Sequence, residues 1–411
     1  MAIPRTRPGR YPAILSYGFR PFFLLGALYS GISILFWLPL LYGATETASL
    51  FIPVDWHIHE MLFGYGAAIV TGFLLTAIPN WTGRLPVQGT PLLALVSLWL
   101  AGRFAVFFSS TIGWVPAMAV DCAFLLAVSA AAGIEILAGH NWRNLKVLIP
   151  VTVLFAANVA FHAEAHLDGV SDVARRLALG AFVVLIMLIG GRIIPSFTHN
   201  WLARMNPGRL PVSFGRFDIA AIVLSVIALA MWAFLPERLE TGVVLVVSAG
   251  INAARLARWA GDRTWRDPLV LVLHLSFAFV PVGLLLVGLS VLVPHAVPQA
   301  AGLHAIGTGA IGAMTLSVMV RATLGHTGRE LRAGIEGCAI FASVLIAAVL
   351  RVGAAFHPEQ TVLLYISAAM WSVAFLGYAL VFGGMLMRPR LRAGEEDRRL
   401  FRALGNSLKR A

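Results

Sequence analysis

The sequence predicts an all-α, polytopic membrane bundle of about twelve transmembrane helices. Hydrophobic residues make up 59% of its 411 residues, while charged residues make up only 12%. A soluble domain carries about a quarter charged residues, so this composition favours lipid as the surrounding solvent. Apolar runs long enough to cross a ~30 Å hydrocarbon core follow one another along the chain, and the short connections between them leave no room for a soluble domain.

Each transmembrane helix needs roughly 20 apolar residues, and the chain supplies such runs throughout its length. The runs lie at 17–42, 57–79, 90–110, 112–138, 147–167, 174–199, 217–236, 238–259, 269–293, 298–323, 333–354 and 360–386. A single transmembrane domain is therefore expected over residues 17–386. We expect a basic cytoplasmic arm at 1–16 before it and a basic cytoplasmic tail at 387–411 after it.

Positive charge lies mainly in every second connection between these runs. The connections after even-numbered runs hold Arg84, Arg143, Arg209, Arg263 and Arg329. Cytoplasmic loops of membrane proteins carry an excess of Lys and Arg, so both termini are predicted to be cytoplasmic. The exceptions on the outer side are Arg175, Arg176, Arg238 and Arg351. Topology and contact with lipid headgroups thus explain the net charge of +12, and no nucleic-acid partner is expected.

The densest group of polar residues inside a predicted span is Trp56-His57-Ile58-His59-Glu60. Residues two apart on a helix point about 200° apart, so His57 and His59 are expected to serve two different centres. Glu60 follows His57 by three residues and should share its face, where it would orient His57 by a hydrogen bond or carry protons. An inert cluster of Trp and His at the membrane interface is the alternative.

Further histidines lie at a similar depth in other spans. His162 and His166 are four residues apart, so both could face one metal ion, and His162 is favoured because His166 borders a loop. His304 lies in the tenth span at similar depth. We therefore expect the second, fifth and tenth spans to bring imidazoles together in the outer leaflet. Neutral imidazole suits copper, zinc and haem iron.

Other ionisable residues inside spans have more than one interpretation. His274, near the inner end of the ninth span, is either a ligand of a second centre or a hydrogen-bonded structural histidine. Arg103 and Asp121 lie at similar depth in neighbouring spans and are expected to form a buried ion pair. Arg192 could bind a cofactor carboxylate, whereas Arg321 is expected to extend to the inner surface.

Glycines gather in the second, sixth and tenth spans, which run in the same direction. Gly66, Gly190, Gly191 and Gly307 are among them. A glycine lets a neighbouring backbone or a flat cofactor approach a helix closely. Ordinary helix packing is the alternative interpretation.

Taken together, these residues resemble the NnrS family of bacterial inner-membrane proteins with about twelve spans. The matching stretches are residues 18–23, 56–65, 72–77, 79–83, 191–195 and 321–329, which follow one another along nearly the whole chain. The block in the second span, with Trp-His-Ile-His-Glu at its start, is the most specific of them.

The resemblance implies a protein of the bacterial inner membrane that binds haem and copper and acts in nitric oxide metabolism, nitrosative stress or denitrification. The histidines that match the family are His57, His59, His304 and His326, with His162 and His274 as weaker matches. We assign His57, His59, His304 and His274 as candidate cofactor ligands, and His57, His59, His162, His304 and His326 as candidate metal ligands. His199 stands where the family pattern has Arg, so it is not counted as a ligand.

The haem–copper oxidases offer an analogy for the arrangement. They also have a twelve-helix core, with a His-x-His pair that faces two haems from one helix, as His57 and His59 would here. The seventh predicted span of this chain contains no histidine, whereas those oxidases carry adjacent histidines on their seventh helix. A copper site of that design is therefore not expected.

The functional hypothesis is an oxidoreductase or detoxifying protein that acts on nitric oxide at a haem, with copper nearby. Electrons would come from a periplasmic donor or a quinol, and Glu60 and Arg192 are the candidate catalytic residues. Two alternatives are a non-catalytic haem-based sensor or scavenger of nitric oxide and a twelve-helix secondary transporter. A signalling output domain and the charged loop of major facilitator transporters are both missing from the sequence.

Overall fold

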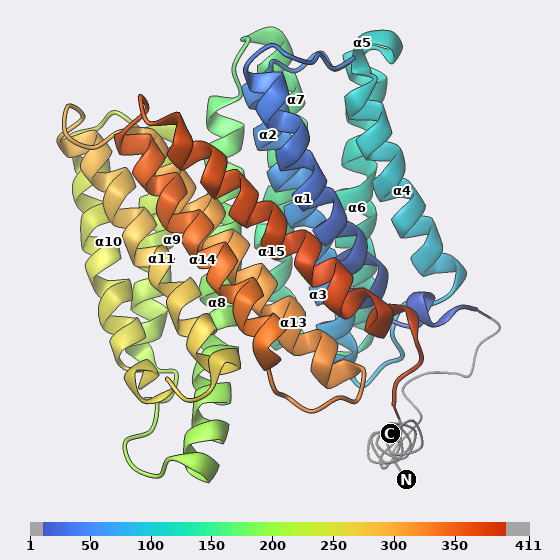
Figure 1. Ribbon diagram of the computed structural model, residues 1–411, viewed down its shortest axis with the longest axis vertical. Coiled ribbons are helices and arrows are strands. Elements are labelled where there is room, and N and C mark those ends of the chain that lie inside the picture. Colours follow the sequence, from blue (N-terminus) through green and yellow to red (C-terminus); the bar gives the residue numbers. More distant parts are fainter. Residues whose placement is uncertain (1–10, 392–411) are drawn as a thin grey trace, which may run out of the picture.

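The computed structural model describes residues 11–391 as a bundle of membrane-crossing helices (Figure 1). Twelve helices within that range are long and apolar enough to cross a membrane, so the protein is a multi-pass membrane protein. The predicted fold class is confirmed. Residues 1–10 and 392–411 lie outside the described residues, so most of the predicted cytoplasmic arm and tail does too.

The first six spans come from the N-terminal half of the chain. They are α1 (Phe19–Leu41), the continuous helix α2–η2–α3 (Pro53–His59, Glu60–Gly66 and Ala67–Thr82), α4 (Thr90–Phe107), α6 (Trp114–Ala138), α7 (Leu148–Leu167, preceded by η3 at Trp142–Val147) and α8 (Asp172–Met205). The second span starts earlier than predicted because Pro53, which suits a first helical turn, begins it.

The last six spans complete the bundle. They are α9 (Arg216–Phe234), α10 (Leu239–Ala257), α11 (Pro268–Leu292), the continuous helix α12–η5–α13 (Gln299–His304, Ala305–Ala313 and Met314–His326), α14 (Gly334–Phe356) and α15 (Thr361–Met387). Helices α1 to α7 form one group and α9 to α14 another, and both α8 and α15 contact members of each group (Figure 1).

The second and tenth spans share an irregularity that the sequence analysis did not predict. In each, a π-helical segment begins directly after a histidine, with η2 following His59 and η5 following His304. A π-helix leaves backbone carbonyls poorly paired, and here side chains bond to them: Trp99 Nε1 donates to Gly64 O at 2.9 Å, and Thr315 Oγ1 to Gly312 O at 2.9 Å. Such segments are frequent at functional sites.

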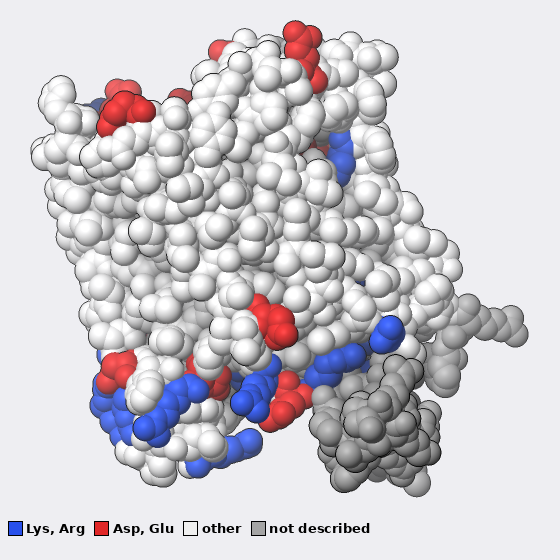
Figure 2. Space-filling model, in the orientation of Figure 1, with Lys and Arg blue, Asp and Glu red and all other residues white. Residues whose placement is uncertain are grey.

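Opposite charges mark the two ends of the bundle. Lys and Arg gather at one end, whereas the opposite end in the same view shows mainly Asp and Glu (Figure 2). The first and last spans meet at the basic end, where Arg20 Nη1 donates to Leu386 O at 2.7 Å and to Arg388 O at 2.6 Å. The basic end is therefore the candidate cytoplasmic end.

Cysteine labelling tests this orientation. In a background of Cys122→Ser and Cys338→Ser, we expect Glu240→Cys at the acidic end to react with a membrane-impermeant maleimide in intact cells. Glu330→Cys, which is exposed at the basic end, should react only after the membrane is opened. Equal labelling of both variants in intact cells would contradict the predicted topology.

Candidate functional site

A cavity of about 400 Å³ lies between the two helix groups, near the acidic end of the bundle. Its wall is mostly apolar, and its charged or ionisable side chains include His57, His304, Arg175 and Arg351. These four residues come from α2, α12, α8 and α14, so tertiary structure alone brings them together. A mainly apolar pocket with few convergent polar groups is typical of a ligand or cofactor site.

Both histidines of the cavity have an uncommitted ring nitrogen. The His57 ring stacks on Trp37 with 4.2 Å between ring centroids, and its buried Nδ1 has no hydrogen-bond partner among the described residues. His304 Nδ1 lies 2.7 Å from the carbonyl oxygen of Ala300, which assigns the proton to Nδ1 and leaves the Nε2 lone pair available. Each imidazole can therefore act as a metal ligand.

The two arginines of the cavity lie on the predicted outer side, where the excess of Lys and Arg in cytoplasmic loops predicts few positive charges. Arg175 Nη2 forms an ion pair with Asp172 Oδ1 at 2.6 Å. Within residues 11–391, Arg351 has no hydrogen bond or ion pair. Gly307 also lines the cavity, and a Cβ built there would meet no atom within 4 Å, so the helix η5 presents bare backbone to this space.

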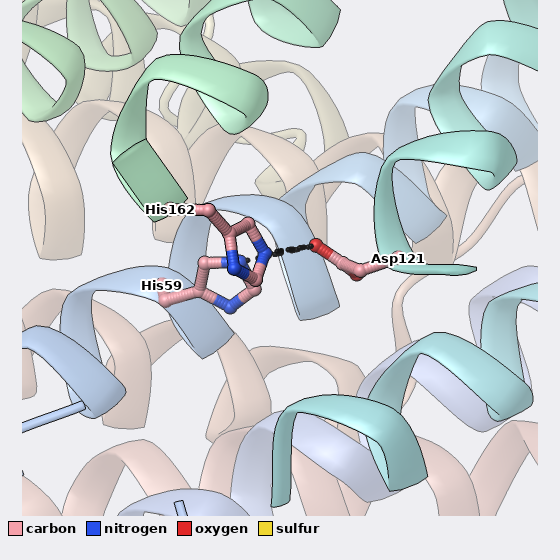
Figure 3. Close-up of side chains that lie close together, drawn as sticks. All are labelled: His59, Asp121 and His162. Atoms are coloured by element: carbon pink, nitrogen blue, oxygen red, sulfur yellow. Dashed lines mark hydrogen bonds and ion pairs between the residues drawn. The ribbon is translucent and has the colours of Figure 1, made fainter. Parts of the chain in front are cut away.

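A second cluster of side chains joins the second span to two neighbouring helices (Figure 3). His59 ends α2, Asp121 belongs to α6 and His162 to α7, and all three are buried. Asp121 Oδ2 lies 3.1 Å from His59 Nε2 and 3.2 Å from His162 Nε2. One ligand atom from each residue lies within 4.8 Å of the others, a spacing at which a single metal ion could contact all three.

Two further residues complete the polar surroundings of His59. Asn158 Oδ1 lies 3.0 Å from His59 Nε2, and Asn158 Nδ2 donates to Asp121 Oδ2 at 2.8 Å. On the other side of the ring, Glu60 Oε1 lies 2.9 Å from His59 Nδ1. Both ring nitrogens of His59 therefore face acceptor oxygens, an arrangement that suits an imidazolium or a metal bound at Nε2.

Arg103 joins the two buried carboxylates. Its Nη1 donates to Glu60 Oε2 at 2.5 Å and its Nη2 donates to Asp121, while the Tyr29 hydroxyl donates to Glu60. With neutral imidazoles, the two carboxylates and one guanidinium leave one uncompensated negative charge. Such a charge is costly inside a membrane protein, so the cluster favours one additional cation, either a proton or a metal ion.

The structure confirms that His57 and His59 face different environments: His57 lines the cavity and His59 belongs to the polar cluster. It also confirms that Arg103 and Asp121 form an ion pair. The expectation of one shared group of imidazoles from three spans is wrong. His57 joins His304, whereas His59 joins His162, because the two residues of the pair point to opposite sides of their helix.

Glu60 does not orient His57, contrary to the expectation from their spacing. Its carboxylate is held by Arg103 and Tyr29 and therefore reaches the neighbouring His59 instead. Arg192 does not line the cavity either, since its Nη1 donates to Asn144 Oδ1 at 2.8 Å, next to the connection before α7.

The remaining histidine candidates lie apart from both groups. His166 stacks on Trp114 at 4.5 Å, and His274 Nε2 lies 2.8 Å from Thr198 Oγ1. His326 packs against the rings of Tyr17 and Phe19, at centroid distances of 6.0 and 5.4 Å.

The sequence analysis expected Arg321 to extend to the inner surface. In the structure its guanidinium carbon lies over the Phe197 ring, 3.9 Å from the ring centroid.

Sequence reasoning missed several residues of the two groups. Arg351 and Arg175 were noted only as exceptions to the charge rule, and that departure was the available signal. Asn158 is a polar residue in the middle of an apolar run, which was a weaker signal. Tyr29 and Trp37 gave none, because aromatic residues are common in spans.

Removal of Arg103 tests the buried ionic cluster. Arg103→Ala leaves Glu60 and Asp121 buried without their shared counter-ion, so we expect the free energy of unfolding to fall by about 3–5 kcal/mol. Denaturant titration in detergent would measure it. The control is Arg84→Ala, which removes an exposed ion pair with Glu135 and should change stability little. Equal effects of the two variants would contradict a stabilising role for the cluster.

Comparison with known proteins identifies a family for nearly the whole chain. The family model described as NnrS protein matches residues 13–390. No curated protein matches the chain.

Proposed function

The chain belongs to the NnrS family, which is linked to nitric oxide responses, and on this premise we propose that it binds haem in the cavity and acts there on nitric oxide. One observation carries the proposal: His57 and His304, from distant parts of the sequence, face one apolar cavity with uncommitted ring nitrogens. Imidazole is a common axial ligand of haem iron, and haem would supply an iron that binds nitric oxide and exchanges electrons.

The cavity suits a flat, largely apolar cofactor. Its volume of about 400 Å³ falls within the range of roughly 300–1,000 Å³ that is usual for ligand pockets. Trp37 and Trp371 provide flat aromatic walls, and Gly307 leaves room for close approach to the backbone. The hydrogen bond between His304 Nδ1 and Ala300 O would fix the ring orientation of a ligating His304.

We propose that copper binds at His59, His162 and Asp121. Two imidazoles and a carboxylate form a donor set suited to first-row transition metals, among which copper(II) generally binds most tightly. A metal cation there would offset the negative charge left by Glu60, Asp121 and Arg103. This metal would lie on the opposite side of the second span from the haem cavity.

Nitric oxide could reach such a centre through lipid. A second, smaller cleft of about 70 Å³ lies between α3, α8 and α13, and apart from Thr315 its lining is apolar. Ile311 lines both this cleft and the larger cavity. Thr315 Oγ1 already donates to backbone carbonyls, so the cleft offers water few partners and suits a small uncharged molecule.

Reduction of nitric oxide would consume electrons and protons. A periplasmic donor or a quinol would supply the electrons from the acidic, outer end of a bacterial inner-membrane protein. Tyr29 of α1 forms a hydrogen-bonded series with Glu60 and His59 of the second span, and this series can hold protons on the opposite side of that span from the cavity. Glu60 is therefore the better candidate for proton handling than Arg192, which bonds to Asn144.

Optical spectroscopy of detergent-purified protein tests the haem proposal. We expect a Soret band that shifts when nitric oxide is added to the reduced protein. His57→Ala and His304→Ala should each lower haem content by at least about 10-fold, because each removes an imidazole that would hold the haem iron. His166→Ala is the matched control, since His166 lies outside the cavity and should leave the spectrum unchanged. A featureless spectrum from folded, haem-supplied wild-type protein would refute the proposal.

Metal analysis tests the copper proposal separately. His162→Ala and Asp121→Asn should lose bound copper and keep haem, because neither residue lines the cavity. Copper measured per chain by mass spectrometry, together with haem measured by absorbance, distinguishes the two sites. Unchanged copper in both variants would place the metal elsewhere.

Consumption of nitric oxide by reduced, metal-loaded protein decides between turnover and binding. Sustained consumption with an added electron donor supports an oxidoreductase. A single stoichiometric uptake would instead support a scavenger or sensor.

A further inference from the structure

Arg351 is a half-buried cation in a membrane-spanning helix, and the described residues give it no counter-ion. It lies in α14, lines the cavity and forms no hydrogen bond or ion pair with any of residues 11–391. His57 and His304 line the same cavity, so the guanidinium and the two imidazoles border one space.

The fully buried arginines of the described bundle have partners. Arg103 contacts Glu60 and Asp121, and Arg255 Nε donates to Asp218 Oδ1 at 2.9 Å. A charged side chain inside a membrane is costly, and the usual remedy is an opposite charge from the protein or from a ligand. Since the described residues supply none for Arg351, the cavity itself is the place from which a negative charge would come.

We propose that Arg351 binds a carboxylate of the cofactor held by His57 and His304. This inference rests on the proposed function and adds the group by which the cofactor is oriented. Arginine binds carboxylates through two parallel hydrogen bonds, a geometry that no other residue type reproduces. The sequence analysis gave Arg192 this role of binding a cofactor carboxylate, whereas the structure favours Arg351, which lines the cavity.

Arg175 is a second, weaker contact for the same chemistry. Its Nη2 is already paired with Asp172 at 2.6 Å, while its buried Nε has no partner among the described residues. Its charge is therefore partly compensated before any ligand binds. A carboxylate should depend mainly on Arg351, and Arg175 should contribute less.

The experiment compares haem with its dimethyl ester, which keeps the iron and the ring but lacks both free carboxylates. Affinity is measured by absorbance titration of haem-depleted full-length protein, and by the rate of haem loss to apomyoglobin. The variants are Arg351→Gln, which removes the charge, and Arg351→Lys, which keeps the charge without the planar geometry. Arg238→Gln, outside the cavity, is the control.

We expect Arg351→Gln to bind haem about 10- to 100-fold more weakly than the wild type, the range of one charge-assisted contact. It should bind the dimethyl ester as well as the wild type does, with Arg351→Lys intermediate for haem. Equal haem affinity in wild type and Arg351→Gln, or equal loss for haem and ester, would overturn the inference. A monodisperse size-exclusion profile for Arg351→Lys guards against misfolding.

A free small anion, such as nitrite, is the other source of a carboxylate-like partner. Nitrite titration followed by tryptophan fluorescence, to which Trp37 and Trp371 of the cavity contribute, tests this source. If wild-type protein takes up no haem, the proposed function fails. If nitrite then binds to the wild type and not to Arg351→Gln, Arg351 serves a free anion and the cofactor assignment is overturned. Nitrite binding that is unaffected by Arg351→Gln also contradicts an anion site at this residue.

Discussion

The interaction on which the rest of the site depends is the contact of Arg103 with Glu60 and Asp121. In a membrane interior, charged groups must be compensated within the protein, so this contact fixes the second, third and fourth spans relative to one another. It holds Glu60 against His59, and it sets which face of the second span turns away toward the cavity. A Cβ at Gly64 would come within 2.7 Å of Glu60 Oε2, so the close packing also requires a glycine.

Two candidate centres share one helix because of the spacing of its histidines. His59 points to the buried polar cluster and His57 to an apolar cavity, so one span separates two chemical environments. The polar cluster is closed and negatively charged, which suits a small cation. The cavity is larger and mostly apolar, with an unpaired arginine, which suits a bulky ligand that carries negative charge. A π-helical segment begins directly after His59 and another directly after His304, so each candidate centre has one beside it.

Much of this fold could be predicted from the chain because lipid imposes simple rules. Long apolar runs give the number of spans, which the described residues confirm, and alternating positive charge predicts that one end of the bundle is basic, as Figure 2 shows. The candidate site was less predictable. Depth in the membrane can be estimated from position in a run, but the direction of a side chain depends on helix rotation. His162 and His304 seemed equivalent by depth, and only packing separated them into two environments.

The sequence by itself determined the membrane bundle, the family, the pairing of Arg103 with Asp121 and the divergence of His57 from His59. These follow from hydropathy, charge and helical periodicity, which are local properties of the chain. Tertiary structure decided that His304 joins His57, that His162 joins His59, and that Arg351 faces the cavity in place of Arg192. Those pairings join spans far apart in the sequence, and only the packing of the twelve helices fixes which faces meet.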